Sequence, residues 1–144
     1  MNEKSGRRTV EMAALLHAAY GVQADVEAKL EGVGLSLPKL MALQALSEAG
    51  ESMPLSQLAG KLSCVKSNIT QLVDRLEADG FVARKDDPND RRSRLAVLTP
   101  AGRKACKEGT RIHQNAEREM QTQLTADEAH QLATLLEKVG KPAT

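Results

Sequence analysis

The chain has 144 residues and a mass of 15.5 kDa, enough for one domain with a real core or for a small lobe with additional helices. One Tyr and one Phe are present, which argues against proteins that stack single-stranded bases or RNA on aromatic side chains. The net charge is +1, but residues 61–111 carry 12 Lys and Arg against 7 Asp and Glu. A basic centre between acidic flanks is typical of a protein with one surface that faces nucleic acid.

Residues 7–34 predict a long helix that Gly32 and Gly34 end. Its apolar residues recur at helical spacing, with Gly21 inside the stripe. The helix cannot bury this stripe alone, so we expect it to pack against a second copy of the chain. The stripe consists of Val10, Ala13, Ala14, Leu16, Ala18, Val22, Val26 and Leu30.

Two short helices are predicted further along the chain, with a break at Ser63 and Cys64 between them. Each has one apolar stripe with a period of 3.6 residues, and polar donors cover the other faces of the second helix. This arrangement is typical of a helix-turn-helix, whose second helix enters the major groove of DNA. Any small helical domain also produces two such stripes, so this segment alone does not decide between DNA binding and ordinary packing. The stripes consist of Leu55, Leu58, Ala59 and Leu62, and of Ile69, Leu72, Val73 and Leu76.

A basic β-hairpin is predicted directly after these helices. Gly80 should end the second helix, since glycine adopts the left-handed conformation there without steric cost. Strands are then expected at residues 81–84 and 93–99, on either side of a turn at residues 86–90. A hairpin in this position is the wing of a winged-helix protein, and the combination is suited to gripping duplex DNA.

Arg91, Arg92 and Arg94 crowd the tip of the predicted wing. We expect them to reach into a minor groove, because a narrow groove concentrates negative potential that attracts Arg. The alternative is that Asp87 or Asp90 pairs with one of these arginines, most simply with Arg92, and stiffens the loop. Both roles are compatible with one hairpin.

Two more helices are predicted in residues 101–140. Pro100 suits the first turn of the first of them, with Thr99 as its N-cap. The second begins at a capping box formed by Thr125 and Glu128 and ends at Gly140. Its apolar stripe again needs a partner, so we expect a homodimer. This stripe consists of Ala129, Leu132, Leu135, Leu136 and Val139.

Two runs in the helix-turn-helix and the wing resemble a known family. Residues 72–82 (LVDRLEADGFV) and 87–102 (DPNDRRSRLAVLTPAG) are similar to the signature of the MarR family of bacterial winged-helix regulators. Weaker similarity extends to residues 35–37 and to Leu124 and Thr125. The resemblance implies a homodimer with interleaved terminal helices, two winged lobes on a pseudo-palindromic operator in double-stranded DNA, and release by a small anionic or phenolic effector or by an oxidant.

Two positions depart from the pattern of the family. Val65 stands where relatives usually have Ser, Thr or Asp at the opening of the recognition helix, so the cap should come from Ser63 or be weaker. Gln71 stands where many relatives carry Arg. Because Gln favours adenine edges, this residue tilts the operator towards A·T-rich sequence.

We therefore predict a mainly α fold with a small β-hairpin wing. It comprises an N-terminal dimerisation helix (7–34), a winged helix-turn-helix DNA-binding lobe (35–100) and C-terminal helices that complete the dimerisation domain (101–140). The expected function is that of a sequence-specific transcriptional repressor, and a winged-helix module that binds protein is the alternative. Arg103, Lys104 and Lys107 either meet phosphate or form a solvated face. The predicted DNA contacts are Lys66, Ser67, Asn68, Thr70, Gln71, Arg75, Arg91, Arg92 and Arg94.

The resemblance places an effector pocket where the dimerisation helices meet the lobe. His17 and Tyr20 could supply polar groups there, and Met12 and Met41 could form apolar walls. All four residues also suit ordinary packing.

Thiol-based redox sensing is a further alternative. Cys64, beside the recognition helix, is a better candidate for it than Cys106. A reactive cysteine needs an exposed thiol with a lowered pKa, and a free cysteine at an apolar position commonly packs as a small hydrophobic residue instead.

The sequence contains no motif of an enzyme: it has no phosphate-binding loop and no nucleophile motif, and its three histidines are scattered. Cys106 and His113 lie about 10 Å apart along the same predicted helix, too far to share an ion. We therefore expect neither a metal nor another cofactor. The sequence also shows no secretory signal and no apolar run that could span a membrane, which predicts a cytoplasmic protein without a membrane partner or a structural disulfide.

Overall fold

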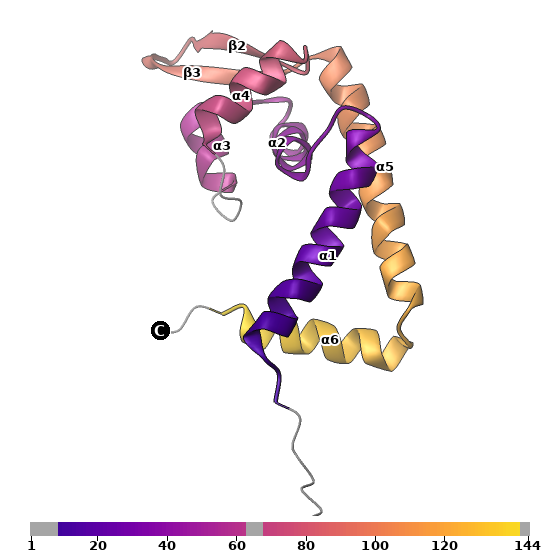
Figure 1. Ribbon diagram of the computed structural model, residues 1–144. Helices are drawn as coiled ribbons and strands as arrows, with labels where there is room; N and C mark the ends of the chain where they lie inside the picture. The colour runs from indigo at the N-terminus through magenta and orange to yellow at the C-terminus, as the bar shows by residue number, and fades with distance from the viewer. Residues whose placement is uncertain (1–8, 63–67, 142–144) are drawn as a thin grey trace, which may run out of the picture.

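The computed structural model describes residues 9–62 and 68–141. These residues form a mainly helical fold with a small antiparallel sheet (Figure 1), as the sequence predicts. The elements are, in chain order, α1 (Met12–Glu31), α2 (Leu37–Glu48), β1 (Ser52–Pro54), α3 (Leu55–Lys61), α4 (Ile69–Ala78), β2 (Val82–Asp87), β3 (Asp90–Leu98), α5 (Pro100–Thr122) and α6 (Ala126–Val139).

A winged lobe, made of α2, α3, α4 and the sheet, occupies one end of the molecule (Figure 1). The helix pair α3 and α4 is the predicted helix-turn-helix. The core lies mainly in this lobe, where α2 contributes a fully buried leucine row that packs with residues of α3 and α4. The largest fully buried side chains are Leu30, Leu40, Leu43, Leu46, Leu58, Val73 and Leu76.

The sheet has three strands in the order β1-β3-β2, one more than the sequence predicts. β1 has only three residues, too few to show an alternating pattern, and it pairs Met53 with Ala96 at the edge of β3. The hairpin itself is longer than expected, because β2 continues to Asp87 and β3 begins at Asp90. The predicted turn over residues 86–90 is therefore wrong in extent: β2 and β3 pair around a bulge at Asp86 and Asp87.

Side-chain caps fix where four of the helices begin. Ser36, Asn68, Thr99 and Thr125 each accept hydrogen bonds from backbone N–H groups of the first turn of α2, α4, α5 and α6 respectively. The caps predicted at Thr99 and Thr125 are confirmed, and the second is a full capping box with Glu128. At the other end of α4, Gly80 has a φ of 78°, the left-handed conformation that the sequence predicts.

The joint between the sheet and α5 is tightly built. The Thr99 hydroxyl donates to the Gly80 carbonyl at 2.6 Å and accepts from the Gly102 N–H at 3.0 Å. Backbone of Phe81 passes so close that a Cβ atom at Gly102 would lie 2.0 Å from the Phe81 carbonyl oxygen. Only glycine fits this position, which explains why the resemblance to the MarR signature extends to Gly102.

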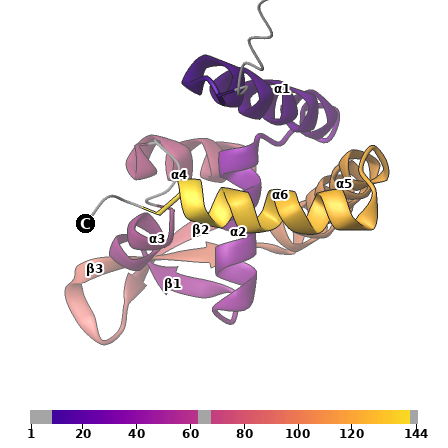
Figure 2. The ribbon, with the colours of Figure 1, turned by 90° about the horizontal axis from the view of Figure 1, so that it is seen from below.

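The two long helices α1 and α5 leave the lobe together, and α6 follows at the far end (Figures 1 and 2). We call the first half of α1 (Met12–Gly21) and the whole of α6 the arms. In the arms no residue is buried. Apart from the half-buried Leu15, their large apolar side chains lie exposed, as for Leu135 at 55% and Val139 at 64%. No helix among the described residues is both long and apolar enough to cross a membrane.

Candidate nucleic-acid interface

The exposed face of α4 carries the predicted base-reading side chains. Leu72, Val73 and Leu76 are buried against the lobe, and on the same helix Thr70, Gln71 and Arg75 are exposed. Asn68 is also exposed, but its Oδ1 accepts from the N–H groups of Thr70 at 3.0 Å and Gln71 at 3.4 Å. Lys66 and Ser67 were predicted in the same set and lie outside the described residues.

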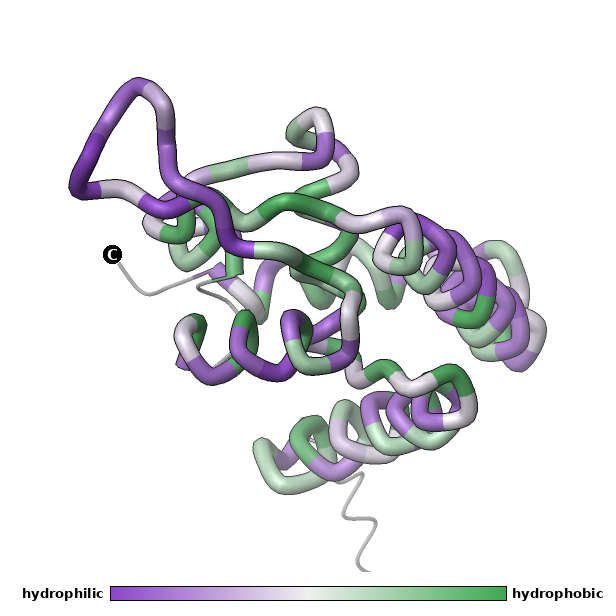
Figure 3. The backbone as a smooth tube through the Cα atoms, turned by 90° about the horizontal axis from the view of Figure 1, so that it is seen from above, coloured by the Kyte–Doolittle hydropathy of each residue, from purple (hydrophilic) through white to green (hydrophobic). Residues whose placement is uncertain are grey.

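The wing tip is hydrophilic and extends beyond the rest of the lobe (Figure 3). Two of its aspartates shape the turn: Asp87 Oδ1 accepts from the Asn89 N–H and Asp90 Oδ1 from the Arg92 N–H, both at 2.9 Å. These carboxylates therefore bind backbone groups, as Asx turns do.

The three wing arginines are all exposed on β3. The alternative pairing of Asp87 or Asp90 with one of these arginines is not formed among the described residues, and Arg94 Nε instead lies 3.8 Å from Asp86 Oδ1. In the part of the chain that the structure describes, neither Arg91 nor Arg92 forms an ion pair. Their guanidinium groups are available to a negatively charged surface.

Arg84 on β2 is a residue that the sequence reasoning missed. Its side chain is only 20% exposed, and its guanidinium forms ion pairs with Asp74 at 2.6 Å and Glu77 at 3.3 Å. A third contact runs from Nη2 to the Thr70 carbonyl at 3.5 Å. Arg84 thus ties the wing to the recognition helix along one side. The spacing of the two acids on the polar face of α4 was the available signal, but only the hairpin geometry shows which cation they meet.

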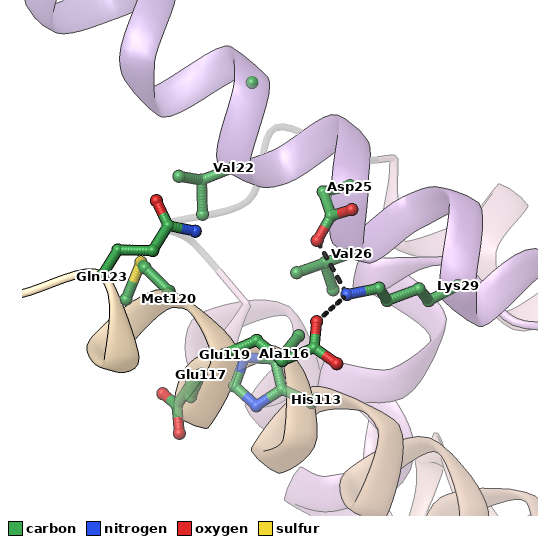
Figure 4. A pocket seen from close by; sticks show the side chains of 11 residues that line it. Val22, Asp25, Val26, Lys29, His113, Ala116, Glu117, Glu119, Met120 and Gln123 are labelled. Atoms are coloured by element: carbon green, nitrogen blue, oxygen red, sulfur yellow. Dashed lines mark hydrogen bonds and ion pairs between the residues drawn. The ribbon is translucent and has the colours of Figure 1, made fainter.

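A groove of about 480 Å³ lies between α1 and α5 (Figure 4). Across it, Lys29 Nζ of α1 lies 2.7 Å from Glu119 Oε2 of α5, and on its own helix it lies 3.0 Å from Asp25 Oδ2. The pKa of the Lys29 amino group is raised, mainly by its hydrogen bond to Glu119 and to a smaller extent by its hydrogen bond to Asp25. With Glu117 also in the lining, three carboxylates face one lysine, so acidic side chains outnumber Lys29 in this groove.

A second groove, of about 550 Å³, lies where α1 meets the start of α2, and Tyr20 lines it together with Glu27 and Glu31. The structure does not gather the four predicted effector residues there. Met12 and His17 are exposed on α1 and line neither groove, whereas Met41 on α2 packs against the core. The i, i+3 spacing of His17 and Tyr20 correctly indicates one shared side of α1. It does not indicate which part of α1 contacts the lobe, and only Tyr20 lies close enough to line a groove.

The comparisons with known proteins agree with this geometry. Residues 35–93 match the MarR family. The chain is 32% identical to the uncharacterized HTH-type transcriptional regulator YcgE of Bacillus subtilis, over 99% of this chain and 92% of that protein. It is 30% identical to the HTH-type transcriptional repressor Mb2911 of Mycobacterium bovis, over 81% of this chain and 83% of that one. The chain belongs to the MarR family of transcriptional regulators.

A solved structure of a MarR-family protein shows the same fold. A mutant of MarR from E. coli, complexed with operator DNA, superposes with a TM-score of 0.75 at 26% identity and covers 89% of this chain and 92% of that one.

The cap of the recognition helix corrects one expectation drawn from the MarR pattern. We expected the helix to open near Val65, with a cap from Ser63 or a weaker cap, but α4 begins at Ile69 and Asn68 caps it. Asn is among the strongest N-cap residues, so the helix start moves to the position where its side chain satisfies two N–H groups. Ser63 and Val65 themselves lie outside the described residues.

The two cysteines differ in what the structure says about them. Cys64, the predicted redox residue, lies outside the described residues. Cys106 on α5 is 8% exposed, and burial raises the pKa of its thiol despite a hydrogen bond with Thr110 that acts in the opposite direction. A protonated, buried thiol is a poor nucleophile, so Cys106 has the properties of a packing residue.

Proposed function

We propose that this MarR-family chain acts as a homodimer that binds a pseudo-palindromic operator, represses transcription, and is released by a small-molecule effector. The observation that supports DNA binding best is the presence, on one rigid lobe, of two complementary devices. These are a helix with exposed donors at Thr70, Gln71 and Arg75, and a wing whose Arg91 and Arg92 lack carboxylate partners among the described residues.

The two devices suit different parts of a DNA duplex. The exposed donors of α4 match base edges in the major groove, where Gln71 can bond an adenine in bidentate fashion. The wing arginines match the negative potential of an adjacent narrow minor groove. Arg84, which belongs to the wing, ties it to α4 through contacts with Asp74, Glu77 and Thr70.

The homodimer is supported by the arms. An isolated chain would leave the apolar stripe of α6 in water, at a cost of about 25 cal/mol for each Å² of apolar surface that a partner could cover. A two-fold dimer also presents two recognition helices, as a pseudo-palindromic operator with half-sites about 34–36 Å apart requires. Repression is supported by the similarity to Mb2911, an HTH-type transcriptional repressor.

Release by an effector is supported by the position of the grooves. The groove lined by Tyr20 lies where α1 meets the lobe, so a ligand there would contact both the dimerisation helices and the DNA-binding lobe. Such a ligand changes the DNA affinity only if it binds more tightly to one arrangement of the two lobes of the dimer than to another.

Fluorescence anisotropy on labelled DNA from upstream of the chain's own gene, against scrambled DNA, tests the proposal. We expect nanomolar affinity for the upstream DNA, with discrimination of at least about 1,000-fold, and a steep loss of affinity as salt rises. Arg91→Gln/Arg92→Gln should weaken binding to both DNAs and reduce the salt slope by about 4, because the proposed dimer carries two copies of each arginine.

The control variant Arg118→Gln/Lys141→Gln removes the same charge from exposed positions on α5 and after α6. It should leave both the affinity and the salt slope unchanged. Equal effects of the two double variants, or equal weak binding of every duplex in a genomic library, would overturn DNA recognition by this lobe and favour a winged-helix module that binds protein.

A further inference from the structure

The first turn of α2 receives one of its caps from α1. Backbone N–H groups in the first turn of a helix have no partner within that helix. The Leu37 N–H donates to Glu27 Oε1 of α1 at 2.8 Å, and the Lys39 N–H donates to the Ser36 hydroxyl at 3.3 Å. Pro38, between them, has no N–H. Each donor among the first three residues of α2 is therefore bound, and the helix dipole also favours a carboxylate at this end.

The connection that this cap spans is short and ordered. Residues 32–36 join α1 to α2, and within them the Leu35 N–H donates back to the Leu30 carbonyl at 3.0 Å. Leu30 and Leu35 are both buried in the core. The bond from Leu37 to Glu27 thus adds a directional contact to a packed joint, and it helps to fix the angle between α1 and α2.

The same first turn of α2 holds the far end of the recognition helix. Lys39 Nζ lies 2.7 Å from Asp79 Oδ2, and Asp79 is the C-cap residue of α4. The two side chains are 20% and 34% exposed, which makes this ion pair the most shielded one among the described residues. Solvent and salt therefore screen it less than an ion pair on the open surface.

The position of Asp79 explains why a cation is needed there. The C-terminal end of a helix carries negative partial charge, so a carboxylate at this end is unfavourable on its own. The ammonium group of Lys39 offsets the charge of Asp79 and is itself favoured near this end of α4. Because Lys39 belongs to α2, the end of the recognition helix is tied to a different element of the lobe.

α2 lies between the end of α1 and α4 and contacts both (Figure 1). The cap and the ion pair together form a polar connection from α1 to the recognition helix. We call its four residues the α1–α4 link: Glu27, Leu37, Lys39 and Asp79. On the side of the wing, Arg84 holds the same half of α4, so two cations from two elements orient this helix.

We propose that Glu27 and Lys39 are positioning residues, which fix the angle of α4 to α1 and thereby the half-site spacing that the dimer accepts. This role rests on the proposed function as a dimer on an operator. Moving a half-site by 1 bp changes its distance by about 3.4 Å and its direction around the DNA axis by about 35°. A lobe can follow only by turning relative to α1, which strains the link. Loss of the link should therefore favour wrongly spaced operators relative to the correct one.

The contacts of the link are tested on the full chain without DNA. By NMR, Glu27→Ala should raise the hydrogen-exchange rate of the Leu37 amide at least about tenfold. Glu27→Gln should keep the slow exchange, because its amide oxygen accepts the same bond. In urea, the double-mutant cycle of Lys39→Met and Asp79→Asn should show a coupling of about twofold to fivefold in the unfolding constant. Unchanged exchange at Leu37 in Glu27→Ala, or no coupling in the cycle, would overturn the link.

The positioning role is tested by anisotropy on three duplexes: the upstream DNA and two versions with 1 bp added or removed between the half-sites. We expect the wild type to prefer the natural spacing by at least about tenfold. Lys39→Met and Asp79→Asn should each reduce this preference at least about threefold, the factor expected for a partly shielded ion pair. These variants change the net charge in opposite directions, so a shared effect does not come from attraction to DNA.

Two further variants sharpen the spacing test. Lys39→Arg keeps a cation beside Asp79 and should keep the preference of the wild type. Arg103→Met is the matched control, because it breaks a 2.6 Å ion pair with Glu51 that involves neither α2 nor α4. It should also keep the preference of the wild type.

Three results would contradict the proposal in different ways. An unchanged preference in both Lys39→Met and Asp79→Asn would show that the link does not set the spacing. Equal weakening by Lys39→Met at all three spacings, with a salt slope reduced by about 2 for the two copies, would assign Lys39 to a phosphate contact. If the contacts pass the tests without DNA but the wild type binds no duplex, the proposed function fails and the positioning role fails with it, whereas the contacts of the link stand.

Discussion

The winged lobe and the arms are built on opposite principles. In the lobe, the leucine row of α2 is fully buried, and Asn68 and Thr99 cap the adjacent helices. In the arms, no residue is buried and the apolar stripes face outwards. The lobe buries its own hydrophobic surface, whereas the arms leave theirs exposed. This division fits the proposed function, in which the lobe binds DNA and the arms pack against a second copy of the chain.

The largest effect should come from placing charge on the exposed apolar stripe of α6. In Leu135→Glu/Leu136→Glu, two side chains that a partner would bury become charged, so we expect the dissociation constant of the dimer to rise roughly 100-fold or more. Sedimentation velocity over a concentration series measures this constant.

His130→Glu/Thr134→Glu is the matched control, because it places two carboxylates on the polar side of the same helix. Its dimer constant should stay close to the wild-type value. Equal dissociation constants for the two double variants would show that dimerisation depends on the charge of α6 and not on its apolar stripe. The arms would then not differ from the lobe in the way proposed.

Within the lobe, the largest effect is expected at the joint with α5. Gly102→Ala forces a Cβ atom against the Phe81 carbonyl oxygen, at a starting distance of 2.0 Å. Because the neighbour is backbone, relief requires the sheet and α5 to move apart, and we expect a loss of about 3 kcal/mol in the free energy of unfolding. Urea denaturation at fixed protein concentration measures it.

Gly60→Ala provides the comparison for this joint, since a Cβ atom at Gly60 meets nothing within 4 Å. This change in α3 should be neutral or stabilise the protein by up to about 1 kcal/mol through helix propensity. A small loss at Gly102, equal to the effect at Gly60, would show that the joint is loose.

The sequence predicted most of the lobe because its signals are local. Gly80 after a helix, Thr99 before Pro100 and the capping box at Thr125 each act within a few residues. β1 was missed because a three-residue strand is defined by its partner in β3. The start of α4 was misplaced because a pattern of relatives directed attention to Val65 and away from the cap that Asn68 provides.

The candidate site divides in the same way. The exposed donors on α4 and the wing follow from periodicity and from a cluster of arginines in the sequence. The pairing of Arg84 with Asp74, and that of Arg94 with Asp86, depend on the register of the hairpin and its bulge. Residues such as Met12 and Met41 were grouped by residue type, and their separation became visible only in three dimensions.

A smaller effect is expected where the wing meets the recognition helix. Arg84→Met leaves the carboxylates of Asp74 and Glu77 without their shared cation, which should cost about 1 kcal/mol of unfolding free energy. A double-mutant cycle with Asp74→Asn measures the pair in urea, and the coupling should be favourable by about 0.5–1 kcal/mol.

The same Arg84 cycle, read out by operator affinity, tests the role of the contact in positioning. Arg84→Met should weaken operator binding by more than its loss of stability accounts for, while the salt slope should fall by no more than about 1. Wild-type affinity in a folded Arg84→Met protein would show that the wing keeps its place without this ion pair.

The smallest effect is a dependence on pH at the start of α6. The Thr125 N–H donates to a Glu128 carboxylate oxygen at 2.9 Å. This bond is the main cause of a lowered pKa of the Glu128 carboxyl, and the Thr125 hydroxyl lowers the pKa further. A carboxyl with a lower pKa in the folded protein contributes stability above its unfolded pKa, and this contribution is lost as the pH falls through the folded value.

Glu128→Gln keeps the capping geometry, because Gln also serves at this position, and removes only the charge. The difference in urea midpoint between wild type and Glu128→Gln should therefore be present at neutral pH and vanish in acid. A difference that persists at low pH would assign the effect to the shape of the cap, and the capping box would then hold α6 without any contribution from the charge.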